Sequence, residues 1–177
     1  MGYTHADCKT DHTPDRLISI FKYQDKLVSK MLNTGKIGLI SDLFFELASI
    51  GFEKVDVRYQ SLDKFVLCPI PLTRFKKRFR GFNQSYIIAQ IFSWRFNLAI
   101  DPVLIKSKST RQQKQLNRQQ RQENLTESFS ISDPSYLPRQ VLLIDDITTT
   151  GSTFIEAARE LKANGVKTVW CLALAQD

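Results

Sequence analysis

The feature that most constrains the fold is an apolar strand near the carboxyl end that runs directly into a polar turn. The strand covers Val141 to Ile144, two aspartates follow it, and a helical pattern then ends before Gly165. A second apolar run spans Lys167 to Ala173. A strand, a helix and a strand in this spacing form a βαβ unit, whose two strands are parallel. The sequence therefore predicts an α/β fold with a parallel sheet flanked by helices.

Three earlier segments complete the predicted layers. Leu39 to Ser49 repeats its apolar residues at helical spacing, which indicates a helix that faces the core. Lys64 to Ile70 is a short apolar run followed by Pro71, as expected of a buried strand that is then broken. Val103 to Ile105 predicts another short strand.

A further helix is expected to begin after Asn83, which is a plausible N-cap, and to stop before Asp101. Its core-facing stripe is predicted from the spacing of Ile87, Ile91, Trp94 and Leu98.

One domain is expected, because 177 residues are too few for two ordinary ones. We place it at residues 39–177 and treat residues 1–38 as a polar N-terminal segment. A basic hood segment of the domain, about residues 106–129, contains a stretch that is nearly devoid of apolar groups.

Several classes of protein are excluded by composition. No apolar run approaches the roughly 18 residues that a membrane span needs, and the first fifteen residues lack the apolar centre of a signal peptide. The cysteines, Cys8, Cys68 and Cys171, are odd in number and far apart, and two of them lie inside apolar runs, so we expect them to be reduced and structural. These features predict a cytoplasmic protein without membrane insertion.

The net charge of +7 is concentrated in the middle third of the chain. Residues 64–122 carry 13 basic groups and 1 acidic group, whereas residues 123–177 carry 4 and 8. Such a field suggests an anionic partner, either a nucleic-acid backbone or a small polyphosphate, and an ordinary solvated basic face is the alternative.

The turn after Ile144 has the composition of a phosphate site. At the carboxyl end of a parallel strand, the next helix presents unpaired N–H groups and the positive end of its dipole. Gly151 allows close approach of the backbone, and the hydroxyls around it can donate to phosphate oxygens. Asp145 and Asp146 suggest a sugar diol with Mg²⁺ nearby. The alternative is a simple capped helix start, with a Thr or Ser N-cap and Asp146 near the dipole.

These thirteen residues, Val141 to Thr153, resemble the phosphoribosyl pyrophosphate (PRPP) signature of the type I phosphoribosyltransferases. The resemblance implies that fold, Mg²⁺ as cofactor, and contacts from Asp145 and Asp146 to the ribose hydroxyls, with the metal held there directly or indirectly. It assigns the 5′-phosphate to Thr148, Thr149, Thr150, Gly151, Ser152 and Thr153. Thr148 stands where an aliphatic residue is common. Thr149 stands where the 6-oxopurine enzymes carry an acidic residue, which disfavours hypoxanthine-guanine salvage.

The basic segment resembles one particular group of phosphoribosyltransferase-like proteins. CPIPLTRFKKRFRGFNQS from Cys68, and STRQQKQLNRQQRQENLTESF from Ser109, resemble motifs of the ComF group, which is linked to natural competence. The resemblance covers about residues 64–175. It implies pyrophosphate contacts from the loop after the first buried strand, at Thr73, Arg74, Lys76 and Lys77.

The hood suits a phosphodiester backbone as well as a nucleobase. Residues assigned to the hood or to nucleic acid are Arg78, Arg80, Phe82, Lys106, Lys108, Arg111, Lys114, Arg118 and Arg121. Phe75, Phe79 and Phe82 are either stacking faces or, at roughly helical spacing, core residues.

Members of the ComF group commonly begin with a four-cysteine zinc ribbon, and this chain has no C-x-x-C pair. His5, Cys8 and His12 alone would make a weak site.

Three functions follow from the sequence. The first is a PRPP- and Mg²⁺-binding phosphoribosyltransferase-type domain in DNA uptake, with an unknown acceptor. The second is a single-stranded DNA-binding competence accessory protein, whose PRPP site is regulatory or vestigial. Nucleobase salvage is the third. Expected partners are PRPP, single-stranded DNA and proteins of the competence apparatus.

Overall fold

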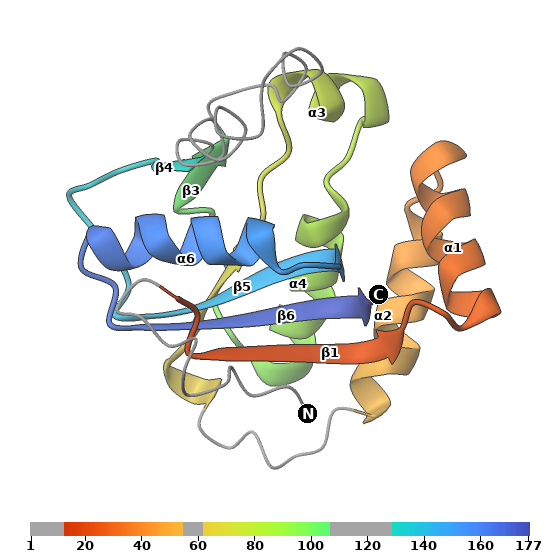
Figure 1. The fold of residues 1–177 in the computed structure, drawn as a ribbon, viewed down its shortest axis with the longest axis horizontal. Coiled ribbons are helices and arrows are strands. Elements are labelled where there is room, and N and C mark those ends of the chain that lie inside the picture. The colour runs from red at the N-terminus through yellow and green to blue at the C-terminus, as the bar shows by residue number, and fades with distance from the viewer. Residues whose placement is uncertain (1–12, 55–61, 107–128) are drawn as a thin grey trace.

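A four-stranded parallel sheet is the centre of the molecule (Figure 1). The computed structural model describes residues 13–54, 62–106 and 129–177. Across the sheet, the strands follow the order β1 (Arg16–Lys22), β6 (Thr168–Gln176), β5 (Gln140–Thr148) and β2 (Val66–Pro69). Each neighbouring pair is parallel, which confirms the predicted α/β class.

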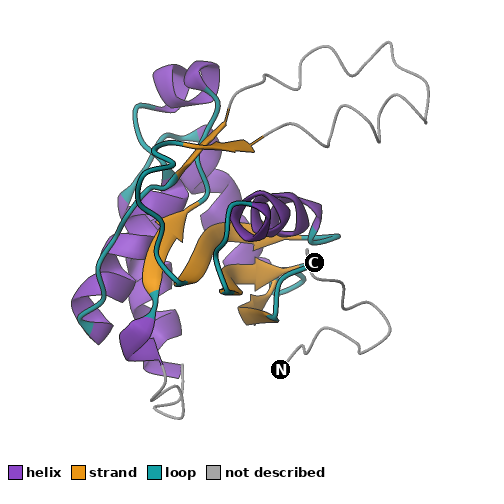
Figure 2. Cartoon of the chain, turned by 90° about the vertical axis from the view of Figure 1, so that its left-hand side faces the viewer, coloured by secondary structure: helices purple, strands orange, loops and turns teal. Residues whose placement is uncertain are grey.

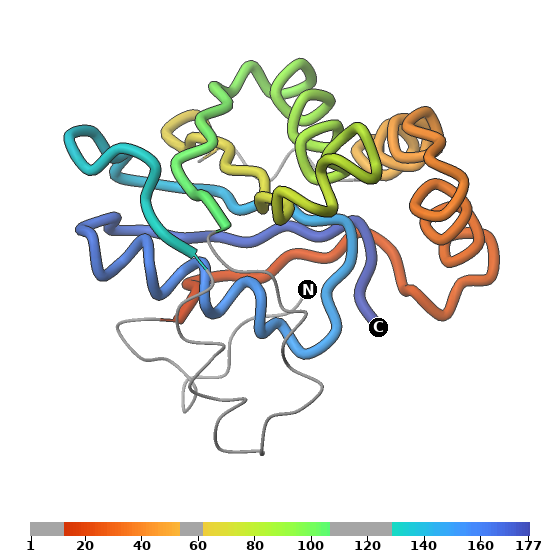
Figure 3. Tube along the Cα trace, turned by 90° about the horizontal axis from the view of Figure 1, so that it is seen from above, coloured from red at the N-terminus to blue at the C-terminus, as the bar shows by residue number. Residues whose placement is uncertain are grey.

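Helices cover both faces of the sheet. One face carries α1 (Lys26–Ile37), α2 (Asp42–Lys54) and α4 (Gln84–Phe96), and the other carries α6 (Ser152–Ala163), as Figure 3 shows from above. Strand β5 is apolar from Val141 to Ile144 because alternate side chains enter both layers. Leu142 and Ile144 join the core under α2 and α4, whereas Val141 and Leu143 join the core under α6.

Three short elements lie outside these layers. The chain forms a 3₁₀ turn (Leu62–Lys64) before β2 and the helix α3 (Arg74–Arg80) after it. Strands β3 (Leu104–Lys106) and β4 (Phe129–Ile131) pair antiparallel as a sheet of their own (Figure 2). The predicted strand at residues 103–105 is therefore present, shifted by one residue, at the described base of the hood.

The predicted start of α4 is confirmed. Asn83 is its N-cap and accepts from the Ser85 N–H, while Asn83 Nδ2 donates to the carbonyl of Ile70 and ties the helix to the loop after β2. The helix ends earlier than expected, at Asn97, whose φ of 52° is left-handed. The predicted stripe was partly wrong, because Trp94 is 84% exposed.

That error in α4 has a physical cause. The helix packs against both α2 and the sheet, so its buried surface is broader than a single stripe. The buried residues include Ile88, Ala89 and Phe92, beside the expected Ile91.

The N-terminal region differs from its prediction. Residues 1–38 were expected to be a polar segment outside the domain, but Arg16–Lys22 pairs with β6 along the edge of the sheet. Asp15 accepts from the Val169 N–H and forms an ion pair with Lys162 of α6 at 2.9 Å. The strand was missed because its burial does not alternate, since an edge strand is only partly covered.

The two described cysteines fit the structural role that was expected of them. Cys68 and Cys171 are free and buried, and burial raises the pKa of the Cys68 thiol to about 12. Cys8, His5 and His12 lie outside the described residues. Among the helices that the structure describes, none has the length and apolar character that crossing a membrane requires.

Candidate functional site

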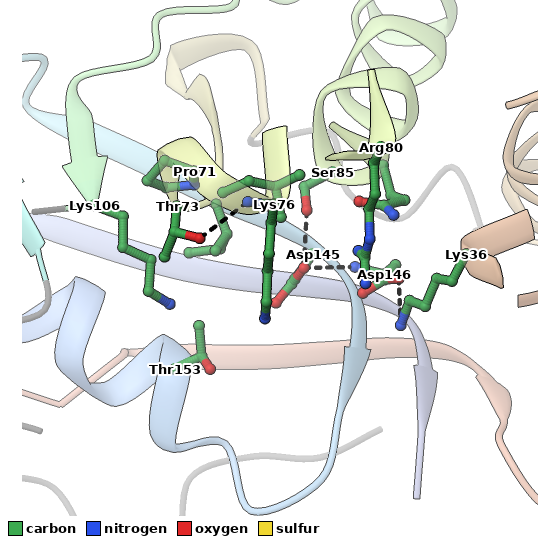
Figure 4. A pocket seen from close by; sticks show the side chains of 13 residues that line it. Lys36, Pro71, Thr73, Lys76, Arg80, Ser85, Lys106, Asp145, Asp146 and Thr153 are labelled. Atoms are coloured by element: carbon green, nitrogen blue, oxygen red, sulfur yellow. Dashed lines mark hydrogen bonds and ion pairs between the residues drawn. The ribbon is translucent and has the colours of Figure 1, made fainter. Parts of the chain in front are cut away.

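A cavity of about 190 Å³ lies where β2 and β5 end (Figure 4). Because both strands are parallel, the loops that follow them meet at one edge of the sheet. The residues that line the cavity are Lys36, Ile70, Pro71, Leu72, Thr73, Lys76, Arg80, Gln84, Ser85, Lys106, Asp145, Asp146 and Thr153. Seven of the residues predicted for the site are thereby brought together.

The two carboxylates at the end of β5 have different partners. Asp145 Oδ1 accepts from the Ser85 hydroxyl at 2.8 Å and from the Asp146 N–H at 2.9 Å. Asp146 Oδ1 accepts from the Ile147 N–H at 2.9 Å, and its Oδ2 lies 2.6 Å from Lys36 Nζ. Adjacent strand residues point to opposite faces, so the pair spreads across the end of the strand.

Asp145 is poised to change protonation near neutral pH. Burial, and then the charge of Asp146, raise the pKa of the Asp145 carboxyl to about 7, against the lowering effects of Ser85 and Lys36. A carboxyl with so raised a pKa in a cavity marks a candidate functional site.

Four cationic side chains surround the carboxylates. They come from two helices and a strand: Lys36 from α1, Lys76 and Arg80 from α3, and Lys106 from β3. Burial, followed by the nearby charge of Lys76, lowers the pKa of Lys106. With two carboxylates among four cations, the cavity is suited to a ligand that carries several negative charges and hydroxyl groups.

Gln84 gives the cavity an unsatisfied polar group. Its side chain is 2% exposed, and Nε2 has no hydrogen-bond partner among the described residues. An unpaired buried amide costs about 1–3 kcal/mol, so such a group is typical of a place where a ligand supplies the partner.

The turn into α6 forms the opposite wall, where Thr153 enters the lining. The N-cap is Gly151, whose φ of 74° is left-handed and favours glycine, and it supplies no side-chain acceptor. The Ser152 N–H donates to Thr150 Oγ1 at 3.4 Å. The predicted alternative, a helix start capped by a Thr or Ser side chain at the N-cap, is therefore not what the structure has.

The remaining residues predicted for the phosphate turn lie around it. Thr149 and Thr150 are exposed, beside Gly151 and Ser152. Thr148 differs, because it is 4% exposed within β5 and alternation places it on the same face as Asp146. Thr148 is therefore the last residue of the strand, whereas the other residues predicted for the phosphate follow it.

The predicted pyrophosphate residues fall into two groups. Thr73 and Lys76 line the cavity, and Thr73 Oγ1 accepts from the Lys76 N–H as the N-cap of α3. Arg74 and Lys77 belong to α3 but do not line the cavity, since the helix turns them toward solvent. Lys108, Arg111, Lys114, Arg118 and Arg121 lie outside the described residues.

The three phenylalanines of the basic segment are divided by the structure. Phe82 packs edge-on against Phe44 of α2, with ring centroids 6.0 Å apart, which is the core alternative. Phe75 and Phe79 are 53% and 68% exposed, and α3 buries none of its residues. Arg78 is exposed on the same helix.

Sequence reasoning missed three polar residues of the site. Gln84 and Ser85 are the last two residues of the motif that begins at Cys68, and their polar side chains directly after the Asn83 N-cap were the signal that could have revealed them. Lys36 carries no local signal, because only the packing of α1 brings it to Asp146.

Among the described residues, no group of three or more His, Cys, Asp or Glu could hold a metal ion alone. Asp145 and Asp146 are the carboxylates in the lining. Mg²⁺ is commonly held by one or two carboxylates together with substrate phosphates and water, so the residues present fit a metal that arrives with a phosphorylated ligand.

Comparison with known proteins places this architecture in a family. A family model described as the phosphoribosyl transferase domain matches residues 81–177. DNA utilization protein YhgH of Salmonella typhi is 32% identical over 168 residues, which cover 89% of this chain and 71% of that protein. Competence protein F of Haemophilus influenzae is 35% identical over 114 residues, covering 62% of this chain and 50% of the relative.

Competence protein ComFC of Bacillus subtilis is 32% identical over 102 residues, covering 57% of this chain and 40% of the relative. The chain thus spans about half the length of Competence protein F and of several YhgH proteins. The family match begins at Gly81, so it contains β5 and α6 but leaves out Lys36 and all of α3. The chain belongs to the phosphoribosyl transferase domain family and, within it, to the ComF group.

Proposed function

We propose that this chain binds PRPP with Mg²⁺ and acts as the phosphoribosyltransferase-type domain of a protein for DNA uptake or use. The observation that carries the proposal is the cavity at the ends of β2 and β5, where two carboxylates, four cations and the uncapped turn of α6 converge. The names of the relatives, Competence protein F and DNA utilization protein YhgH, support the biological role.

Each part of PRPP has a matching part of the site. Asp145 and Asp146 accept hydrogen bonds from the ribose hydroxyls. The turn 149–153 holds the 5′-phosphate through backbone N–H groups at the positive end of α6. Lys76 and Arg80 neutralise the pyrophosphate with Thr73 beside them. The cavity is smaller than the roughly 300–1,000 Å³ of most ligand pockets, so PRPP would extend from it toward the exposed turn.

Mg²⁺ would be shared between the substrate phosphates and Asp145 or Asp146. When bound, it supplies positive charge that stabilises the departing pyrophosphate. Because the chain contributes so few ligands, PRPP should bind more weakly when EDTA removes the metal.

The chemistry that this arrangement favours is displacement of pyrophosphate from the anomeric carbon of the ribose. The protein contributes position and charge: the carboxylates orient the sugar, and the cations stabilise the leaving group. The acceptor that forms the new bond with that carbon would enter from the side of Lys106 and the hood.

Calorimetric titration with PRPP and Mg²⁺ tests the proposal. The wild-type protein should bind, and Asp145→Asn/Asp146→Asn, which keeps the shape of both side chains, should lose the affinity. Lys167→Ala, an exposed substitution before β6, is the matched control and should bind as the wild type does. Equal affinity in the double variant, or no binding by the folded wild type, would refute the assignment.

A second candidate function, single-stranded DNA binding, is favoured by one specific observation. Helix α3 exposes Phe75 and Phe79 beside five basic side chains, and it buries nothing. Bases stack on exposed aromatic rings while phosphates pair with basic residues. Its distinguishing test is a fluorescence titration with a labelled oligonucleotide. Affinity should fall steeply with salt, and Phe75→Ala/Phe79→Ala should lower it further; a flat salt response argues against DNA binding.

A further inference from the structure

Lys36 is a site residue that neither the sequence motifs nor the matched family segment contains. It belongs to α1, and its Nζ lies 2.6 Å from Asp146 Oδ2 at the cavity wall (Figure 4). The family match covers residues 81–177, so this contact joins the N-terminal part of the fold to the carboxylates.

The position of Lys36 is fixed by close packing. A Cβ on the preceding residue, Gly35, would lie 2.6 Å from Phe44 Cε2, so α1 and α2 approach closely at this point. Phe44 is fully buried, as is Leu32 on the previous turn of α1. Lys36 therefore reaches the site from the point where α1 packs closely on α2, and its side chain is only 23% exposed.

Lys36 supplies the polar partner of the second oxygen of Asp146. With Ile147 N–H on Oδ1 and Lys36 on Oδ2, both oxygens of this buried carboxylate have a fixed partner. In Asp145, by contrast, both donors reach Oδ1, and no hydrogen bond among the described residues reaches Oδ2. The pair is asymmetric, with one carboxylate held from two sides and the other open toward the cavity.

Removing the positive partner would change both acids. A buried carboxylate without its cation is strongly disfavoured, and a second carboxylate on the next residue adds repulsion. The other charges around the pair, Lys76, Arg80 and Lys106, come from α3 and β3.

We propose that Lys36 is a positioning residue for sugar binding: its ion pair with Oδ2 holds Asp146 in the orientation in which the carboxylate pair can accept hydrogen bonds from the ribose hydroxyls of the ligand. This inference rests on the proposed function, because it assigns the carboxylates to the ribose. It separates Lys36 from Lys76 and Arg80, which would act on the phosphates directly.

The test compares two ligands by calorimetry, PRPP with Mg²⁺ and inorganic pyrophosphate with Mg²⁺, on the wild type and on Lys36→Met, which keeps the length of the side chain. PRPP affinity should fall about tenfold or more, whereas pyrophosphate affinity should stay within about twofold, because pyrophosphate has no sugar. Lys36→Arg should recover most of the PRPP affinity. Lys30→Met, an exposed position on the same helix, should have no effect.

The outcomes separate the two claims. If the folded wild type does not bind PRPP, the proposed function fails and this inference fails with it. If the wild type binds but Lys36→Met binds PRPP equally well or more tightly, only the inference is overturned. Equal losses for PRPP and pyrophosphate would show a general effect of charge and would also overturn the inference. Circular dichroism and thermal unfolding report separately whether the variant is folded.

Discussion

At the scale of single residues, two neighbours of the same type occupy opposite electrostatic environments. Asp146 is buried against Lys36, whereas Asp145 is partly buried with a hydroxyl and a like charge beside it. The first arrangement compensates the charge and the second leaves it costly. A buried, poorly compensated charge at a cavity is typical of a site that sacrifices stability for binding.

Asp145→Asn should therefore stabilise the ligand-free protein at high pH. The carboxyl has a pKa of about 7 in the folded protein against an ordinary value of 3.8, so the folded state holds the proton more tightly than the unfolded state. The stabilising contribution of the protonated Asp145 to the free energy of unfolding is complete below about pH 4, and it is lost as the pH rises through 7. The amide carries no charge, and it can still accept from Ser85.

Thermal unfolding between pH 4.5 and pH 8, without metal or PRPP, checks this prediction. The melting temperature of the variant should exceed that of the wild type by about 3 °C or more at pH 8, and the gap should close toward pH 4.5. Asp133→Asn, at an exposed turn, should give no such widening. A constant difference across the pH range would contradict the assigned pKa.

The residues of the site could be predicted only where a local pattern carried them. Asp145, Asp146 and Thr153 follow a recognisable strand, and Thr73 follows another. The end of the strand could not be predicted, because β5 continues past the aspartates and includes Thr148, which by sequence alone reads as part of the turn. Lys36 depends on how a distant helix packs, and no local pattern encodes that.

At the scale of elements, the turn between β5 and α6 has the most specific backbone requirement. Gly151 has a φ of 74°, and a Cβ there would meet nothing within 4 Å, so the requirement is conformational rather than steric crowding. Gly151→Ala should cost about 1–2 kcal/mol of stability. It should also weaken PRPP binding, because relaxing the strain reorients the N–H groups at the start of α6.

Gly165→Ala is the matched control for that variant. Gly165 follows the other end of α6, with a φ of 100° and the same open surroundings. It should lower the melting temperature by a similar amount and leave the PRPP affinity unchanged. Calorimetry and thermal unfolding on both variants decide the point. If Gly151→Ala binds PRPP like the wild type, the turn is not the phosphate site.

Most elements could be predicted because their apolar periods are strong. The exceptions are instructive: β1 lies at a sheet edge with intermediate exposure, and α3 has no apolar face in the core at all. Strand β1 depends on its pairing with β6, which lies outside its own sequence, whereas α3 is defined by its Thr73 N-cap and its Gly81 C-cap.

At the scale of the whole molecule, the N-terminal region is part of the fold. Strand β1 pairs with β6 in parallel from Arg16 to Lys22, and α1 packs on α2. A chain shortened to begin at residue 39 should therefore lose cooperative thermal unfolding, because the apolar strand β6 becomes an edge and α2 loses its partner. A sharp transition close to that of the full chain would contradict this view.

The central claim is that the carboxylates, the cations and the turn of α6 form one PRPP site. A crystal structure of the protein with PRPP and Mg²⁺ tests it most directly. The account predicts the ribose hydroxyls at Asp145 and Asp146, the 5′-phosphate at the N–H groups of residues 151–153, and the pyrophosphate between Lys76 and Arg80. PRPP bound elsewhere, or with its phosphates and sugar exchanged between these places, would contradict it.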